Sequence, residues 1–196
     1  TEAELFPIMS LSDRIARDRN SDVITRDDVA AAVMEQFYRA SNVIDESVKL
    51  YQKGQILIQL TGKTVGQING LGVLELTGAN DISYGEPLRI TATVLSALSR
   101  IPIRQDLAVT GSLDQFGNIQ AVGGLNEKVE GFFRICRLFG LTGQQGVVLP
   151  ACNISNLTLH SDVVSAIADG KFHIYPVSRV EEAVELLLGT PAESTD

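Results

Sequence analysis

The stretch Thr110–Lys128 constrains the fold of this chain more than any other part of the sequence. An apolar run, Leu107–Val109, leads into it, and a polar turn separates this run from a second apolar one. Gly117 and Asn118 can both take the positive φ that a tight hairpin needs. The pair Gly123–Gly124 allows a sharp turn or a close approach of two backbones, and a helical pattern follows it. The stretch therefore predicts a strand, a hairpin, a double-glycine turn and a helix.

Lys128 falls in the first turn of that helix, where the helix dipole disfavours a cation. The plain interpretation is a surface lysine whose ammonium stays in water. A functional interpretation needs apolar surroundings, and Leu125, Val129 and Phe132 occupy neighbouring helical positions. Together with Val122, these side chains could desolvate the ammonium and lower its pKa. The sequence alone leaves both interpretations open.

Composition limits the classes of protein that fit. The chain has 196 residues, which suits one medium domain or one domain with an appendage. Its net charge of −8 argues against a nucleic-acid-binding surface. No apolar run approaches the length of a membrane span, and the N-terminus has no signal-peptide pattern. We therefore expect a cytoplasmic protein that binds neither nucleic acid nor membranes.

Cysteine and histidine are too few and too scattered for a metal centre. Cys136 and Cys152 make neither a disulfide framework nor a metal site, and their apolar contexts predict small core side chains. His160 and His173 are far apart and lie near no cysteine-rich or acidic cluster. We expect both histidines to be structural and no metal to be bound.

The first 50 residues have helical patterns. Thr25 is a good N-cap for a helix that continues through Asp27 and Asp28, and a second helix is predicted over Ser41–Tyr51. Residues 55–60 and 65–76 read as strands, and Tyr84–Pro87 as a turn.

The C-terminal half alternates strands with helices. Strands are predicted at 145–150 and 172–177, and helices at 162–168 and 180–188, the last with Ser178 as its N-cap. Residues 193–196 form a polar tail. Alternating strands and helices predict an α/β (α+β) domain with flanking helices.

The tripeptide Gly62-Lys63-Thr64 matches only the end of a phosphate-binding loop. Such a loop requires a glycine five residues before Gly62, where this sequence has Leu57. We therefore interpret the tripeptide as a hairpin turn, and we expect no ATP site in this chain.

The sequence TGSLDQFGNIQAVGGLNEKVEGFF, with LTGQQGVVLP after it, resembles the proteolytic domain of Lon-type ATP-dependent serine proteases, in particular a bacterial Lon-related branch. The match extends from about Tyr51 to Leu188 and includes VGQINGL near its start. The resemblance implies a Lon proteolytic domain with mixed sheets over 51–196. It also implies that residues 1–50 are the helical tail of an AAA+ lid or linker.

The resemblance assigns two site residues. The family pattern G-G-x-x-x-K matches residues 123–128, which implies that Lys128 is the base of a Ser–Lys catalytic dyad. It also implies that Thr110, in the family's Thr-Gly pair, orients this lysine. Such a dyad would hydrolyse peptide bonds through an acyl-enzyme, because a neutral lysine can take the proton of a serine nucleophile.

The nucleophilic serine of the family has no counterpart in this sequence. Counting the family's interval back from Thr110 reaches Gly85. Ser96 and Ser99 fall too far along the expected helix, and Ser112 follows the Thr-Gly pair directly. We therefore predict that a segment holding the nucleophile is missing near residues 94–95, where a strand pattern becomes a helix pattern without turn residues.

Two functions remain open. The first is a serine endopeptidase domain that acts on unfolded or damaged proteins within a homo-oligomeric, usually hexameric, ring. ATP and Mg²⁺ would then belong to an ATPase module outside this chain, as the resemblance implies. The second is a proteolytically inactive scaffold or oligomerisation domain with the same fold.

Overall fold

The computed structural model describes residues 2–76, 82–91 and 94–189 of the chain. The chain divides into two compact units. The first consists of Thr1–Ile56 with Glu75–Ser83, and the second of Leu57–Leu74 with Tyr84–Asp196. None of the helices in the described ranges is both long and apolar enough to cross a membrane.

The first unit is built on two helices that pack against each other, α1 (Glu2–Asp18) and α2 (Arg26–Gln52). Thr25 is the N-cap of α2, as predicted, and the Asp28 carboxylate accepts hydrogen bonds from the Thr25 backbone N–H and hydroxyl. The prediction of a separate helix from Ser41 is wrong. No glycine or proline interrupts residues 26–52, so one helix continues through them.

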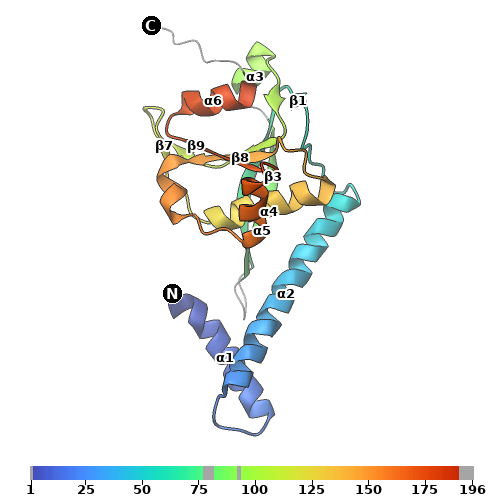
Figure 1. The fold of residues 1–196 in the computed structure, drawn as a ribbon, viewed down its shortest axis with the longest axis vertical. Coiled ribbons are helices and arrows are strands. Elements are labelled where there is room, and N and C mark those ends of the chain that lie inside the picture. Colours follow the sequence, from blue (N-terminus) through green and yellow to red (C-terminus); the bar gives the residue numbers. More distant parts are fainter. Residues whose placement is uncertain (1, 77–81, 92–93, 190–196) are drawn as a thin grey trace. The chain divides into compact units, whose positions relative to one another are not determined.

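The second unit contains a five-stranded sheet in the order β3-β2-β5-β8-β9 (Figure 1). The strands are β2 (Gln67–Leu76), β3 (Ile82–Thr91), β5 (Leu107–Val109), β8 (Gly146–Pro150) and β9 (His173–Val177). Residues 75–76 of β2 and 82–83 of β3 are the parts of these strands that fall in the first unit. Neighbours from β2 to β9 run parallel.

Helices cover both faces of this sheet. Figure 1 shows α6 (Val180–Leu188) on one side of the sheet, and α4 (Leu125–Phe139) and α5 (Ser161–Ala168) on the other. The predicted α/β fold with mixed sheets and flanking helices is confirmed.

A hydrophobic core lies on each side of the sheet. The core under α6 includes Leu107 and Val148 from the strands and Ala183 and Leu187 from the helix. On the other side, the Phe172 ring contacts Phe133 and Phe132 of α4, with centroids 5.2 and 6.2 Å apart. Rings at these separations add to the stability that their burial already provides.

Two pairs of short strands and two short helices complete the second unit. They are β1 (Lys63–Thr64) with β4 (Ile103–Arg104), β6 (Ser112–Leu113) with β7 (Ile119–Gln120), α3 (Val94–Ser99) and the 3₁₀ helix η1 (Ala151–Asn156). The β6–β7 pair is the predicted hairpin, and Gly117 takes a φ of +81° in its turn. Asn118 does not need positive φ, because its backbone N–H and side chain both donate to the Asp114 carboxylate.

Two local predictions near the start of this unit are wrong. The predicted strand over residues 55–60 does not form, since the Gln59 carbonyl accepts a hydrogen bond from the Asn69 side chain instead of from a neighbouring strand. Tyr84–Pro87 is no turn but part of β3. Pro87 is tolerated there because β3 is the last strand in the sheet order.

In the Gly62-Lys63-Thr64 tripeptide, Gly62 lies in a bend and Lys63–Thr64 form β1, which pairs with β4. The tripeptide is therefore not a hairpin turn, because its own strand residues pair with a segment about forty residues further on. The helix that follows a phosphate-binding loop is replaced here by a strand.

Two further predictions need correction. Cys136 is buried, as predicted, but Cys152 is exposed, because η1 turns it away from the core. The N-cap of α6 is Arg179 rather than Ser178. The Glu182 carboxylate accepts the backbone N–H groups of both residues, and the Ser178 carbonyl accepts the Ile119 N–H. The cap therefore lies one residue later than predicted, while the helix spans 180–188 as predicted.

Two regions with sequence predictions lie outside the described residues. The polar tail at residues 193–196 is one. The other is residues 92–93, which adjoin the predicted missing segment; Val94 and Leu95 themselves open α3.

Candidate active site

Lys128 lies in the first turn of α4, and the double glycine sets the direction of this helix. Gly124 is the N-cap with a φ of +63°, and its carbonyl accepts the Lys128 backbone N–H at 3.1 Å. A Cβ at Gly124 would come within 2.6 Å of the Val73 side chain. Glycine is therefore required at this position both by the backbone conformation and by the neighbouring strand.

The Lys128 side chain is half-buried. Burial lowers the pKa of its ammonium, and the nearby Glu127 carboxylate opposes this effect in part. Within the described ranges, no hydrogen bond or ion pair joins the Lys128 Nζ to another residue. Desolvation without a salt-bridge partner is the condition that brings a lysine toward the neutral form a general base requires.

Strand β3 passes directly against the backbone of α4 beside Lys128. A Cβ at Gly85 would lie 1.8 Å from the Glu127 carbonyl oxygen and 2.7 Å from the Lys128 Cα. A Cβ at Gly131 would lie 2.0 Å from the Gly85 carbonyl oxygen. Only a pair of glycines permits this approach, so Gly85, the position to which the family's interval counts back, packs against the backbone of Lys128.

Thr110 follows β5 directly and is 7% exposed. Its backbone N–H donates to the Val148 carbonyl at 3.1 Å, which extends the pairing of β5 with β8. Thr110 also lines an apolar cavity of about 290 Å³, together with residues such as Leu113, Ile119 and Val184.

Lys128 is not among the residues that line this cavity. No hydrogen bond joins Thr110 to Lys128 in the part of the chain that the structure describes. The structure therefore places Thr110 after β5 and Lys128 in the first turn of α4, without a hydrogen bond between them.

Ser96, Ser99 and Ser112, the serines considered as possible nucleophiles, are either bound to backbone groups or exposed. The Ser96 hydroxyl donates to the Ile101 carbonyl and accepts the Gly66 backbone N–H, so it holds the end of α3. Ser99 is exposed and accepts the Ile101 backbone N–H, and Ser112 is exposed as well. Among the described residues, no hydrogen bond joins Ser96 or Ser112 to Lys128.

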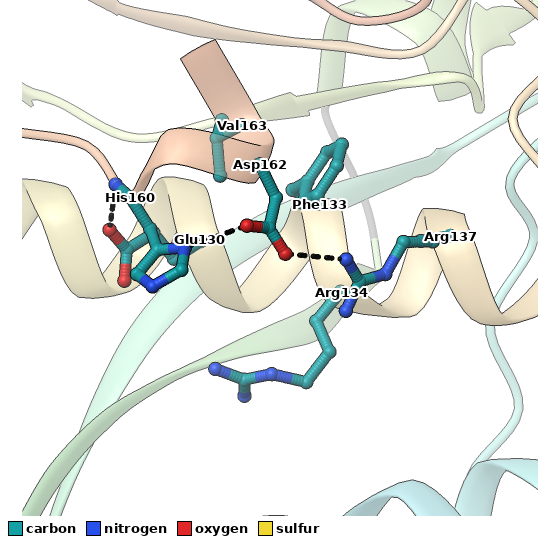
Figure 2. Close-up of a pocket in the computed structure, with 7 residues that line it drawn as sticks. All are labelled: Glu130, Phe133, Arg134, Arg137, His160, Asp162 and Val163. Atoms are coloured by element: carbon teal, nitrogen blue, oxygen red, sulfur yellow. Dashed lines mark hydrogen bonds and ion pairs between the residues drawn. The ribbon is translucent and has the colours of Figure 1, made fainter. Parts of the chain in front are cut away.

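The histidines lie elsewhere. Figure 2 shows a charged pocket between α4 and α5, in which the Asp162 carboxylate contacts Arg137 at 2.8 Å and the His160 ring at 3.0 Å. His173 Nε2 lies 2.9 Å from the Gly143 carbonyl oxygen. Across the described residues, no group of three or more His, Cys, Asp or Glu side chains could hold a metal ion.

Sequence reasoning missed two features of the site. Gly85 and Gly131 form one backbone contact although they are far apart in the sequence. The Asn153 side chain is hydrogen-bonded to the backbone of Val122. No local pattern marks either contact, since both depend on how distant segments meet in space.

Residues 85–190 match the family model of the Lon protease C-terminal proteolytic domain. This match covers more than half of the chain and contains both Thr110 and Lys128. The chain belongs to the Lon protease family and contains a Lon-type proteolytic domain.

Curated relatives agree with this assignment. A Lon protease homolog of Escherichia coli is 34% identical over 204 residues, which cover 68% of this chain and 35% of the relative. A Lon protease homolog of Haemophilus influenzae is 50% identical over 113 residues, covering 55% of this chain and 19% of the relative. An archaeal Lon protease of Archaeoglobus fulgidus is 33% identical over 101 residues, covering 52% of this chain and 14% of the relative. The aligned region thus spans about a third or less of the length of these relatives.

The alignment with the Escherichia coli relative is longer than the part of this chain that it covers. Because 68% of 196 residues is about 133, about 71 of the 204 aligned positions hold no residue of this chain.

Proposed function

We propose that this domain hydrolyses peptide bonds with a Ser–Lys dyad in which Lys128 is the general base. Thr110 orients the lysine, and the nucleophilic serine belongs to a segment that is missing near residues 94–95. The observation that carries the proposal is the Lys128 ammonium, half-buried and without a hydrogen-bond or ion-pair partner among the described residues, in a chain of the Lon family.

The chemistry follows from the state of the lysine. A serine hydroxyl is a weak nucleophile until an adjacent base takes its proton. An ordinary lysine has a pKa of about 10.4 and stays protonated at neutral pH, so it cannot serve as that base. Burial shifts the pKa of Lys128 in the required direction. The Thr110 hydroxyl would accept a hydrogen bond from the Lys128 amine and direct its lone pair to the nucleophile.

Two observations support a missing nucleophile segment. The alignment with the Escherichia coli relative contains about 71 positions without a residue of this chain, since 68% of 196 residues are covered. The Ser96 hydroxyl proton is already donated to the Ile101 carbonyl, which argues against Ser96 as a substitute.

One observation favours the alternative, a proteolytically inactive scaffold with the same fold. β3 packs on the backbone of Lys128 through Gly85, and among the described residues no serine is hydrogen-bonded to the lysine. A scaffold, however, gains nothing from a half-buried lysine, because burial of an ammonium without a partner costs stability.

The remaining proposals follow from the family. The substrates would be unfolded or damaged proteins, and the domain would act in a cytoplasmic homo-oligomeric ring. Hydrolysis would be driven by an ATPase module that binds ATP and Mg²⁺ outside this chain.

Lys128→Ala in the natural protein tests the dyad. We expect cleavage of casein or of a fluorogenic peptide to fall by roughly 10²- to 10⁴-fold, the usual contribution of a positioned general base. Lys171→Ala, at an exposed lysine paired with Asp169, is the matched control and should leave cleavage unchanged. Full cleavage by the Lys128→Ala variant would exclude the dyad.

A tryptic digest of the natural protein separates the dyad from the scaffold. Arg89 and Arg100 are cleavage sites, so a continuous chain yields the peptide ITATVLSALSR from residues 90–100. We expect mass spectrometry to miss this peptide and to find serine-containing peptides of an inserted segment, with an intact mass several kilodaltons above 21.1 kDa. Detection of ITATVLSALSR as a major product would favour the scaffold.

A further inference from the structure

We propose that Asn153 is a positioning residue for Lys128, because its amide fixes the backbone of Val122 and thereby the double-glycine turn from which α4 starts. This inference rests on the proposed function of Lys128 as the base.

Asn153 lies in η1 and is 8% exposed. Its Oδ1 accepts the Val122 backbone N–H at 3.0 Å, and its Nδ2 donates to the Val122 carbonyl at 3.2 Å. One side chain thus satisfies both backbone polar groups of Val122, as a neighbouring strand would. Two hydrogen bonds to the backbone of one residue fix its orientation as well as its position.

The residues after Val122 need such an external restraint. Gly123 and Gly124 have no side chains that limit their backbone angles, and a Cβ at Gly123 would meet open space. Glycine backbones lose the most conformational freedom on folding, so the shape of this turn depends on contacts at its two ends.

The same segment that holds Val122 also contacts the helix side of the turn. Just beyond η1, the Thr158 backbone N–H donates to the Asn126 Oδ1 at 2.9 Å. Asn126 is the second residue of α4. The segment 153–158 therefore restrains both ends of the double glycine, with Asn153 at the strand end and Asn126 at the helix end.

The position of Lys128 depends on this turn, because the lysine lies one helical turn after Gly124. Its backbone N–H bonds to the Gly124 carbonyl, so a shift at Gly124 moves the lysine directly. On its other side, the helix backbone already touches Gly85 of β3. Loss of the Asn153 amide would allow the turn to relax away from this contact, which would admit water to the ammonium and raise the pKa of Lys128 toward its usual range.

The experiment compares Asn153→Ala with Asn156→Ala. Asn156 has the same side chain in the same 3₁₀ helix but is exposed, which makes it the matched control. The first measurement is the pKa of Lys128, obtained from an NMR titration of protein labelled with ¹³C at the lysine Cε. The Lys128→Arg variant identifies the Lys128 signal in the spectrum. The second measurement is kcat and KM for peptide cleavage by the natural protein.

We expect Asn153→Ala to raise the pKa of Lys128 and to lower kcat by on the order of tenfold or more with little change in KM, since small displacements of a catalytic group are costly. Asn156→Ala should change neither quantity. A folded Asn153→Ala protein with the wild-type Lys128 pKa and kcat would overturn the proposal. If Asn153→Ala fails to fold, Asn153→Ser replaces it, because a serine side chain is too short to make both hydrogen bonds to Val122. An unchanged Lys128 pKa in that variant would overturn the proposal equally.

The NMR measurement does not depend on proteolysis. If Lys128→Ala retains full cleavage, the proposed function is wrong whatever Asn153 does. If Lys128→Ala is inactive and Asn153→Ala is indistinguishable from Asn156→Ala, the dyad stands and only the positioning role is wrong.

Discussion

Helices α4 and α3 differ in how they are held, although both belong to the proteolytic domain. α4 has 15 residues and buries a stripe that includes Leu125, Val129 and Phe132. α3 has six residues, and its Leu98 side chain is 80% exposed. A helix as short as α3 has little stability of its own, so it depends on the hydrogen bonds of Ser96.

The difference between α4 and α3 separates the proposed site into two parts, the region of the lysine and the region next to the predicted missing segment. The part around Lys128 is packed on the sheet and restrained at both ends of its turn. The described side chains of α3 are those of Ser96, which is buried and binds backbone groups, and of Leu98 and Ser99, which are exposed. The chain thus contains the proposed base, Lys128, with its packed surroundings, while α3 begins close to the predicted missing segment.

The largest effect should come from the packed face of α4. Phe132 is fully buried against Phe172, so Phe132→Ala should lower the free energy of unfolding by about 3–5 kcal/mol. Leu98→Ala on α3 should change it by less than about 0.5 kcal/mol, as at other exposed sites. Urea unfolding followed by circular dichroism measures both, and similar losses for the two variants would break the comparison.

Gly85→Ala probes the contact between β3 and α4. The new Cβ would collide with the Glu127 carbonyl oxygen, and overpacking of this kind costs about 1–3 kcal/mol or more. Gly123→Ala is the control, because its Cβ meets open space and its φ is not positive, so it should be nearly neutral. A stable Gly85→Ala protein in thermal unfolding would show that β3 does not pack on Lys128 as described.

Ser96→Ala tests whether Ser96 has a structural role in α3 or a catalytic one. It leaves the Gly66 N–H and the Ile101 carbonyl without their partner, at a cost of about 1–3 kcal/mol for buried polar groups. We expect lower stability in chemical denaturation but an unchanged kcat at temperatures where the variant is folded. Complete loss of peptide cleavage by a folded Ser96→Ala protein would instead make Ser96 the nucleophile.

The smallest effect concerns pH. Burial lowers the folded-state pKa of Lys128, so the folded protein releases this proton at a lower pH than the unfolded chain, whose lysines titrate at about 10.4. Between these two pKa values the unfolded state binds more protons, and the free energy of unfolding rises with pH. The cost of burying the ammonium is therefore full below the folded-state pKa and disappears above the unfolded-state pKa.

Lys128→Met removes this cost. The variant should exceed the wild type in stability at about pH 7, and the difference should shrink by about pH 10. Urea unfolding at both values measures it, with Lys171→Met at an exposed lysine as the control. A difference that stays constant with pH would mean that it does not arise from the charge of Lys128.

Much of the second unit follows from local patterns. The span of α6, the start of α4 and the strands β8 and β9 agree with the sequence predictions to within about one residue, because apolar periodicity and glycine positions act over a few neighbours. The errors at Tyr84–Pro87 and at Cys152 have the opposite origin. A Gly-Glu-Pro sequence typical of turns lies in a strand because the partner of Gly85 is a helix backbone more than forty residues away.

In the candidate site, too, local sequence patterns predict some features and contacts between distant segments decide others. The family pattern and the apolar positions around Lys128 are local features that point to this lysine as the base, and the lowered pKa agrees in direction. The restraint of its turn by Asn153 was beyond prediction, because an asparagine in a loop is locally indistinguishable from Asn156.

The sequence by itself determined the family, the order of strands and helices in the C-terminal half, and the lysine that fits the family's base. These depend on residue type and spacing along the chain. Only the tertiary structure decided that Gly85 and Gly131 bring β3 against α4, that Ser96 holds backbone groups, and that Asn153 fixes the turn before Lys128. Such contacts join segments tens of residues apart, and their energy depends on the three-dimensional approach of backbones, which no short-range pattern encodes.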